Sequence, residues 1–236
     1  MPMLTADQID DFATDGFLVI DRIVDDEAVA ELRTAYQRLL DDPGIAAGDR
    51  QLGGITRQIM MPSLADPDFD ENEVVDAVAD VAEQIIGGPV VRLFDMLIYK
   101  GPGHPHETPW HQDMAYAQMP FAPVGTFTAA PLLQFWVALD DADAENGCMH
   151  FIPGQHERPL LEHVVASGEP DDDGRLLAIR DPDSALDMDQ VVPAPLASGG
   201  CTVHAYGTWH FTPPNRSATR LRRAYILNFM ATDEPG

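Results

Sequence analysis

The sequence predicts a mostly β fold with flanking helices, of the barrel or jelly-roll kind. Before residue 90, several segments carry apolar stripes at helical spacing. After residue 90, short apolar runs alternate with Pro, Gly and Asp, and this pattern is typical of short strands joined by turns. A parallel sheet is disfavoured, because it needs helices between its strands and the second half leaves little room for them.

Residues 1–90 are expected to give mainly helical support. Thr5 and Gln8 resemble a capping box, and Gly16 is placed to end the helix that they begin. The other elements expected here are a strand at 17–20, a helix that Asp25 or Asp26 caps and Pro43-Gly44 stops, a Gly-rich loop at 45–55, a strand at 56–61 and a helix at 73–86.

Residues 90–232 are expected to form the jelly-roll core of one domain that spans residues 1–236. An acidic segment at 166–190, rich in Pro, Gly and Asp, reads as a long loop or lid inserted between strands. The strands expected are 90–99, 110–115, 132–139, 149–152, 191–192, 201–205 and 222–230.

Composition narrows the classes of partner. The formal net charge of −25 predicts no binding to nucleic acid or to anionic membranes. No apolar run is long enough to cross a membrane, no signal peptide is recognised, and two cysteines make neither a disulfide framework nor a zinc site. A cytoplasmic location fits best, the oligomeric state is not readable, and the expected partner is a small-molecule substrate, with a natural-product intermediate as the favoured class.

His111-Gln112-Asp113 is the most informative motif. In a β-strand, residues two apart point to the same face, so an imidazole and a carboxylate would lie side by side. A second imidazole from His210 would complete two histidines and one carboxylate. That donor set, with open positions left over, is typical of non-haem Fe(II) oxygenases.

Several ordered segments together resemble the phytanoyl-CoA dioxygenase family of Fe(II)/2-oxoglutarate-dependent oxygenases. The resemblance covers roughly residues 10–230. It is carried by the segments 96–100, 109–113 with Tyr116, 135–140, 145–156 and 210–217, and by Arg222-Arg223-Ala224. It implies a double-stranded β-helix, a cupin-like form of jelly roll, and a dioxygenase that couples decarboxylation of 2-oxoglutarate by O2 to hydroxylation of a substrate.

The resemblance also implies roles for particular residues. His111, Asp113 and His210 correspond to the Fe(II) ligands, and the family spacing selects His210 over the nearby His204. Arg222 corresponds to the arginine that binds the distal carboxylate of 2-oxoglutarate, with Arg220 as the alternative, because this chain departs from the family spacing by one residue. Three further residues correspond to the co-substrate site: Met96, Trp136 and Thr212.

Alternatives stay open at this point. Met96 and Trp136 suit ordinary core packing as well as a pocket wall, and Lys100 suits either a surface or a pocket. His150 either faces the pocket or packs in its strand. A cupin-like metalloenzyme that does not use 2-oxoglutarate is a second hypothesis, and a non-catalytic binding module is a third. Desaturation, epoxidation or ring formation are other outcomes of the same chemistry, whereas Asp113 argues against halogenation. Substrate specificity is expected to depend on loops at 45–55, 104–109, 117–130 and 166–190.

Overall fold

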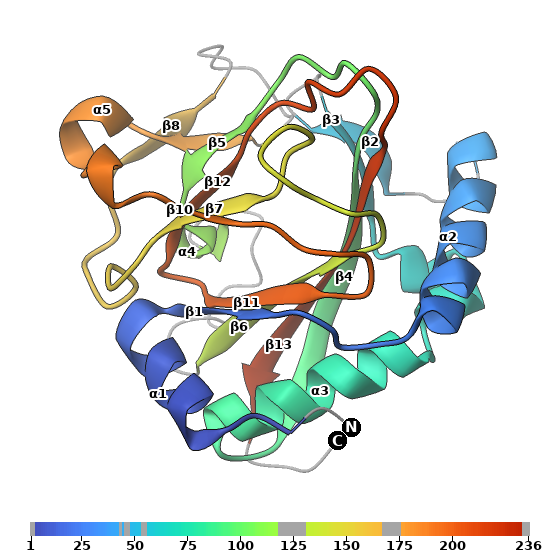
Figure 1. Cartoon of the computed structure of the whole chain (residues 1–236), viewed down its shortest axis with the longest axis horizontal. Coiled ribbons are helices and arrows are strands. Elements are labelled where there is room, and N and C mark those ends of the chain that lie inside the picture. The colour runs from blue at the N-terminus through green and yellow to red at the C-terminus, as the bar shows by residue number, and fades with distance from the viewer. Residues whose placement is uncertain are drawn as a thin grey trace.

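Two antiparallel sheets face each other and form a double-stranded β-helix (Figure 1). The computed structural model describes residues 3–42, 44, 48–52, 56–117, 131–166 and 176–232. The large sheet has the strand order β1-β11-β6-β13-β4-β3-β2, and the small sheet has the order β10-β7-β12-β5. A two-stranded sheet of β8 and β9 lies beside β5. The predicted jelly roll is therefore confirmed.

The strands are short except for β4 and β13, which pair along most of their length in the middle of the large sheet. The large sheet consists of β1 (Phe17–Ile20), β2 (Asp49–Leu52), β3 (Thr56–Met60), β4 (Val90–Lys100), β6 (Leu132–Ala138), β11 (Cys201–Ala205) and β13 (Arg222–Ala231). The small sheet consists of β5 (Thr108–His111), β7 (Met149–Ile152), β10 (Val192–Ala194) and β12 (Trp209–Thr212), and the third of β8 (His163–Val165) and β9 (Leu177–Ile179).

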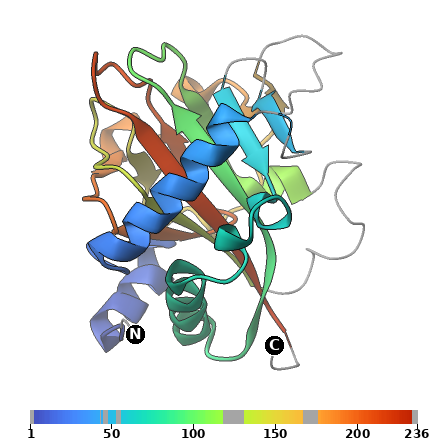
Figure 2. The ribbon, with the colours of Figure 1, turned by 90° about the vertical axis from the view of Figure 1, so that its right-hand side faces the viewer.

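Three helices cover the outer face of the large sheet (Figure 2). Their ends follow the predicted signals: Thr5 and Gln8 form a capping box, and Gly16 adopts the left-handed conformation that ends a helix. The side chain of Asp25 accepts hydrogen bonds at the start of the second helix. The helices are α1 (Ala6–Asp15), α2 (Asp26–Asp41) and α3 (Glu73–Ile86). Shorter turns are α4 (Asp113–Ala117), α5 (Pro182–Ala185), η1 (Pro62–Leu64), η2 (Pro67–Phe69) and η3 (Met188–Gln190).

The two faces of the large sheet have different chemistry. On β13, Tyr225, Leu227 and Phe229 pack against the helices, whereas Ala224 and Ile226 face the small sheet. Because side chains alternate along a strand, β4, β6 and β11 divide their residues in the same way. The inward residues with polar side chains gather between the two sheets and include Lys100, Gln134, Thr202, His204, Arg222 and Asn228, all buried.

Several expected elements differ from the structure. Strand β5 ends at His111 instead of running to residue 115, because the chain turns into α4 at Asp113. The expected loop at 45–55 contains β2, and the expected loop at 166–190 contains β9, α5 and η3. Strand β12 was not among the strands predicted. Parts of the loops expected at 45–55, 117–130 and 166–190 lie outside the described residues, namely 45–47, 53–55, 118–130 and 167–175.

Within the described residues, no helix combines the length and the apolar character that crossing a membrane requires.

Candidate metal centre and co-substrate site

Three buried side chains converge between the two sheets. His111 ends β5, His210 lies opposite it on β12, and Asp113 begins α4. One ligand atom from each residue lies within 4.8 Å of the others, a grouping that could hold a metal ion. The distance to Asp113 Oδ1 is 3.7 Å from His111 Nε2 and 3.9 Å from His210 Nε2.

Both imidazoles are fixed in the form that a metal needs. Nδ1 of His111 lies 2.7 Å from the carbonyl oxygen of Pro109, and Nδ1 of His210 lies 2.9 Å from that of Thr208. Because a carbonyl oxygen only accepts, each Nδ1 carries the proton and each Nε2 keeps a free lone pair. Burial lowers the pKa of His111 and lowers that of His210 further, so both rings are held neutral.

The Asp113 carboxylate has one free oxygen and one occupied oxygen. Nε2 of His204 lies 3.0 Å from Oδ2, and Nε2 of Gln134 donates to the same oxygen at 2.8 Å. Burial raises the pKa of Asp113, but the facing His210 and the hydrogen bond from His204 hold it below its ordinary value. The carboxylate is therefore ionised, with Oδ1 available to a cation.

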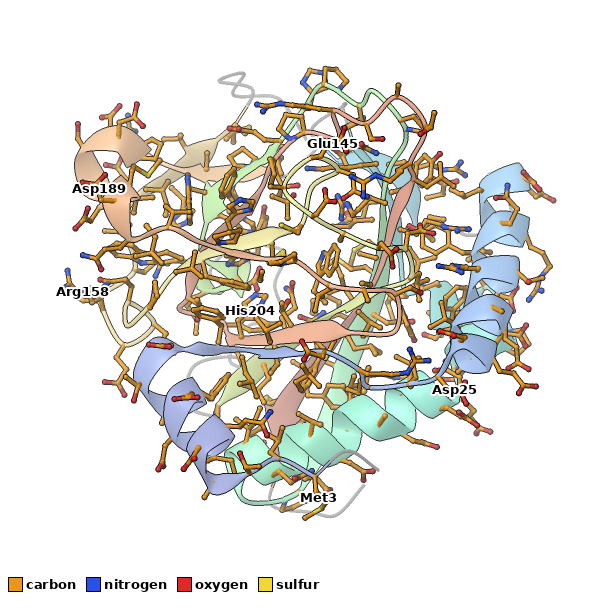
Figure 3. The ribbon with its side chains drawn as sticks, viewed as in Figure 1. Met3, Asp25, Glu145, Arg158, Asp189 and His204 are labelled. Atoms are coloured by element: carbon orange, nitrogen blue, oxygen red, sulfur yellow. The ribbon has the colours of Figure 1, made fainter. Side chains whose placement is uncertain are left out.

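His204 and Gln134 are contacts that the sequence did not reveal. His204 was considered only as a rival of His210 for the distal ligand position, and Gln134 is hidden in an apolar run. Strand alternation is the signal that could have found them: Val203 and Phe135 belong to the outer core, so His204 and Gln134 must face inward. In Figure 3 the labelled His204 lies beside β11, toward the small sheet.

Arg222 and Lys100 bring two buried basic side chains together farther along the same interior. They are register partners on β13 and β4, and both are buried. Lys100 Nζ donates to Thr212 Oγ1 at 2.8 Å and to the carbonyl oxygens of Thr212 and Pro213. Nε and Nη2 of Arg222 have no hydrogen-bond partner among the described residues. Burial lowers the pKa of Arg222 to about 10, so the guanidinium stays charged at neutral pH.

Unpaired N–H groups on a buried cation call for an anion. Each unsatisfied buried donor costs about 1–3 kcal/mol. The two oxygens of one carboxylate would accept hydrogen bonds from both unpaired N–H groups of the planar Arg222 guanidinium. The guanidinium carbon of Arg222 lies 5.4 Å from the centre of a Trp136 ring, which supports its orientation.

Met96 and Trp136 line the interior between the His-Asp-His group and the pair of Arg222 and Lys100. Both are register partners of Ile226, from opposite sides, and all three pack in the inner apolar cluster. The sulfur of Met96 accepts a hydrogen bond from Gln58. The two sequence alternatives, core packing and a wall of the interior, therefore describe the same positions.

Arg220 and Arg222 occupy different environments. Arg220 forms ion pairs at 2.8 Å with Asp143 and 2.6 Å with Glu145, in a partly exposed cluster. In Figure 3 the labelled Glu145 lies well away from His204. The loop between His210 and Arg222 is fixed by Asn215, whose side-chain amide donates to the carbonyl oxygens of Lys100 and Arg220.

Several other histidines lie outside the group of three. His150 is directed away from the interior and packs on Phe211, so its position is the packed one. His163 accepts a hydrogen bond from the backbone N–H of Gln112, and His104 pairs with Thr56.

The model of the phytanoyl-CoA dioxygenase (PhyH) family matches residues 12–224. This chain belongs to that family. Peroxisomal phytanoyl-CoA dioxygenase of Mus musculus is 29% identical over 178 residues, covering 68% of this chain and 50% of the relative. The chain thus spans about half the length of the curated relatives that it matches.

Two solved structures extend the comparison to 98% or more of the chain. EvdO2 from Micromonospora carbonacea var. aurantiaca, complexed with 2-oxoglutarate, has a TM-score of 0.80 and 29% identity, covering 100% of this chain and 96% of its own. The α-ketoglutarate-dependent carbocyclase SnoK from nogalamycin biosynthesis has a TM-score of 0.74, with coverages of 98% and 85%. At 20% identity, SnoK supports the shared fold alone.

Proposed function

We propose that this member of the phytanoyl-CoA dioxygenase family is an Fe(II)- and 2-oxoglutarate-dependent oxygenase of a small molecule, with hydroxylation as its outcome. The observation that carries the proposal is the pairing of two features in one interior. A His-Asp-His group with free ligand atoms lies there together with a buried arginine whose donors are unsatisfied. A metal site alone would not require the buried arginine.

His111 Nε2, Asp113 Oδ1 and His210 Nε2 would hold the iron. Two neutral imidazoles and one carboxylate suit Fe(II), and three protein ligands leave coordination positions open. Bound iron with 2-oxoglutarate and O2 supplies the oxidation, releasing succinate and CO2 and transferring one oxygen atom to the substrate. The protein's part is to hold the three ligands in one protonation state and to exclude water around them.

Arg222 would bind the distal carboxylate of 2-oxoglutarate, because its guanidinium is charged, buried and in need of an acceptor. Arg220 is the weaker alternative, since Asp143 and Glu145 already occupy its donors. Thr212 would donate its hydroxyl proton to the same carboxylate, because Lys100 already donates to Thr212 Oγ1. Met96 and Trp136 would flank the co-substrate.

Asp113 fills the ligand position that a halide would need, which disfavours halogenation. Cyclisation, desaturation and epoxidation remain rival outcomes to hydroxylation, because the same iron and 2-oxoglutarate chemistry can lead to each of them. A natural-product intermediate remains the favoured substrate class. A cytoplasmic location stays a prediction.

The deciding experiment is an anaerobic titration of the protein with Fe(II) and then with 2-oxoglutarate, followed by visible absorption. We expect one Fe(II) per chain and a charge-transfer band that appears only when 2-oxoglutarate chelates the iron. Succinate release on admission of O2 would complete the test. Metal binding without any effect of 2-oxoglutarate would support the cupin-like alternative instead, and no metal binding would refute both.

A further inference from the structure

The two oxygens of Asp113 are treated differently by the protein. Oδ1 faces Nε2 of His111 and of His210, at 3.7 and 3.9 Å. Oδ2 receives two hydrogen bonds, from Gln134 and from His204, both of which are buried. A carboxylate on a surface would exchange its two oxygens by rotation. Here two fixed donors to one oxygen oppose that rotation.

The two donors reach Asp113 from neighbouring strands of the large sheet. Gln134 on β6 and His204 on β11 are register partners, so their side chains leave the sheet at the same level and on the same face. Asp113 comes from the opposite side, at the start of α4, where the backbone N–H of Met114 donates to the carbonyl oxygen of Tyr206. The large sheet thereby orients a ligand that belongs to the small sheet's side of the site.

We propose that His204 and Gln134 are positioning residues that hold Asp113 as a one-oxygen metal ligand. The inference rests on the proposed function. Without the two hydrogen bonds, the carboxylate could turn and bind the metal through both oxygens. It would then take a coordination position that the co-substrate or O2 needs. The two donors thus keep the metal's open positions open.

His204 is assigned this role and not that of a ligand. Its Nε2 is directed at Asp113 Oδ2, and a ring nitrogen that donates a proton there has no lone pair for a metal. Its ring lies 4.3 Å from that of His210, close enough to be mistaken for a ligand on distance alone. The direction of the hydrogen bond separates the two roles.

The test uses Co(II) as a spectroscopic probe of the purified protein under anaerobic conditions. His204→Leu and Gln134→Met remove one donor each and keep the approximate volume. We expect each to weaken Co(II) binding about 10- to 100-fold, the usual effect of losing a group that orients a ligand. The visible Co(II) spectrum should also change in shape, because the carboxylate is free to bind through two oxygens.

Two further variants make the result decisive. His204→Gln restores an N–H donor near the position of Nε2 and should recover the Co(II) affinity to within about threefold. His150→Leu changes a histidine that is directed away from the interior and should bind Co(II) like the wild type. Thermal unfolding of each variant identifies any that fail to fold, and the second donor residue then carries the test.

The outcomes separate this inference from the proposed function. If the wild type binds no Co(II) or Fe(II), the proposed function fails. If the wild type binds Co(II) and both donor variants keep its affinity and spectrum, only the positioning role is overturned. Complete loss of binding in His204→Leu without rescue by His204→Gln would instead make His204 a metal ligand and would also overturn the inference.

Discussion

Arg222 lies opposite Lys100 on the neighbouring strands β13 and β4, so two basic side chains are buried side by side in the interior. Neither forms an ion pair with a carboxylate among the described residues. Lys100 satisfies its donors with Thr212 and Pro213, whereas Arg222 keeps two donors unsatisfied. This imbalance is what a carboxylate of a bound molecule would correct, and it leads to the first two predictions.

Arg222→Leu should weaken 2-oxoglutarate binding and leave metal binding unchanged. Hydrogen bonds to a charged group contribute about 1.5–3 kcal/mol, which corresponds to roughly a 10- to 150-fold rise in Kd. Titration of the Fe(II)-loaded protein with 2-oxoglutarate measures it. Arg220→Leu is the matched control and should shift the Kd by less than about threefold, since it removes exposed ion pairs. The reverse ranking would transfer the anchoring role to Arg220.

Lys100→Met should weaken 2-oxoglutarate binding about 10-fold without changing metal binding, because Thr212 would lose the donor that orients its hydroxyl. The substitution also leaves two carbonyl oxygens without this partner, so the melting temperature should fall. Thr212→Val, which removes the hydroxyl itself, should give a similar affinity loss. If Lys100→Met alone alters affinity, then Lys100 itself contacts the co-substrate and this account of Thr212 is wrong.

His111→Gln and His210→Gln should each lower the metal content of the purified protein from about one equivalent to near zero. Each removes one of the three ligand atoms that the described residues bring together at this site. Elemental analysis after dialysis against Fe(II) measures the metal content, and His150→Gln serves as the control. Full metal retention in either ligand variant would remove that histidine from the metal site.

The free energy of unfolding of the metal-free protein should include a contribution from His104 that decreases as the pH falls from about 7 to about 4. Burial lowers the pKa of His104 to about 4, whereas the unfolded chain takes up that proton near 6.5. The unfolded state therefore binds more protons in this window, and stability rises with pH through it. His104→Gln should flatten the dependence relative to the wild type.

Urea unfolding at several pH values measures that effect. His106→Gln, at the exposed neighbour that packs against the His104 ring, is the control for local disruption. The net charge of −25 becomes smaller as carboxylates are protonated, and this affects the stability of every variant. Comparing the slope of the free energy of unfolding against pH between variants cancels that shared effect. Equal slopes for the wild type and His104→Gln would contradict the prediction.

Local sequence signals predicted the parts of this fold that depend on neighbours along the chain. Thr5 with Gln8, Asp25 and Gly16 marked helix ends because capping involves residues within a few positions. The strand predicted at 110–115 was wrong beyond residue 111, because the local sequence at 111–113 is compatible with either a strand or a turn. What ends β5 is tertiary: the buried Gln112 side chain donates to Gly207, and its backbone N–H donates to His163.

The sequence by itself determined the family, the β-rich fold and the three residues that meet in the interior, because motif, order and strand alternation are written along the chain. Only the tertiary structure decided which arginine is buried and what holds Asp113. Arg220 and Arg222 have the same parity, but the strand begins at Arg222, opposite Lys100, while Arg220 meets Asp143 and Glu145. Strand alternation places His204 and Gln134 on the inner face, but their hydrogen bonds to Asp113 join distant segments and so depend on the tertiary structure.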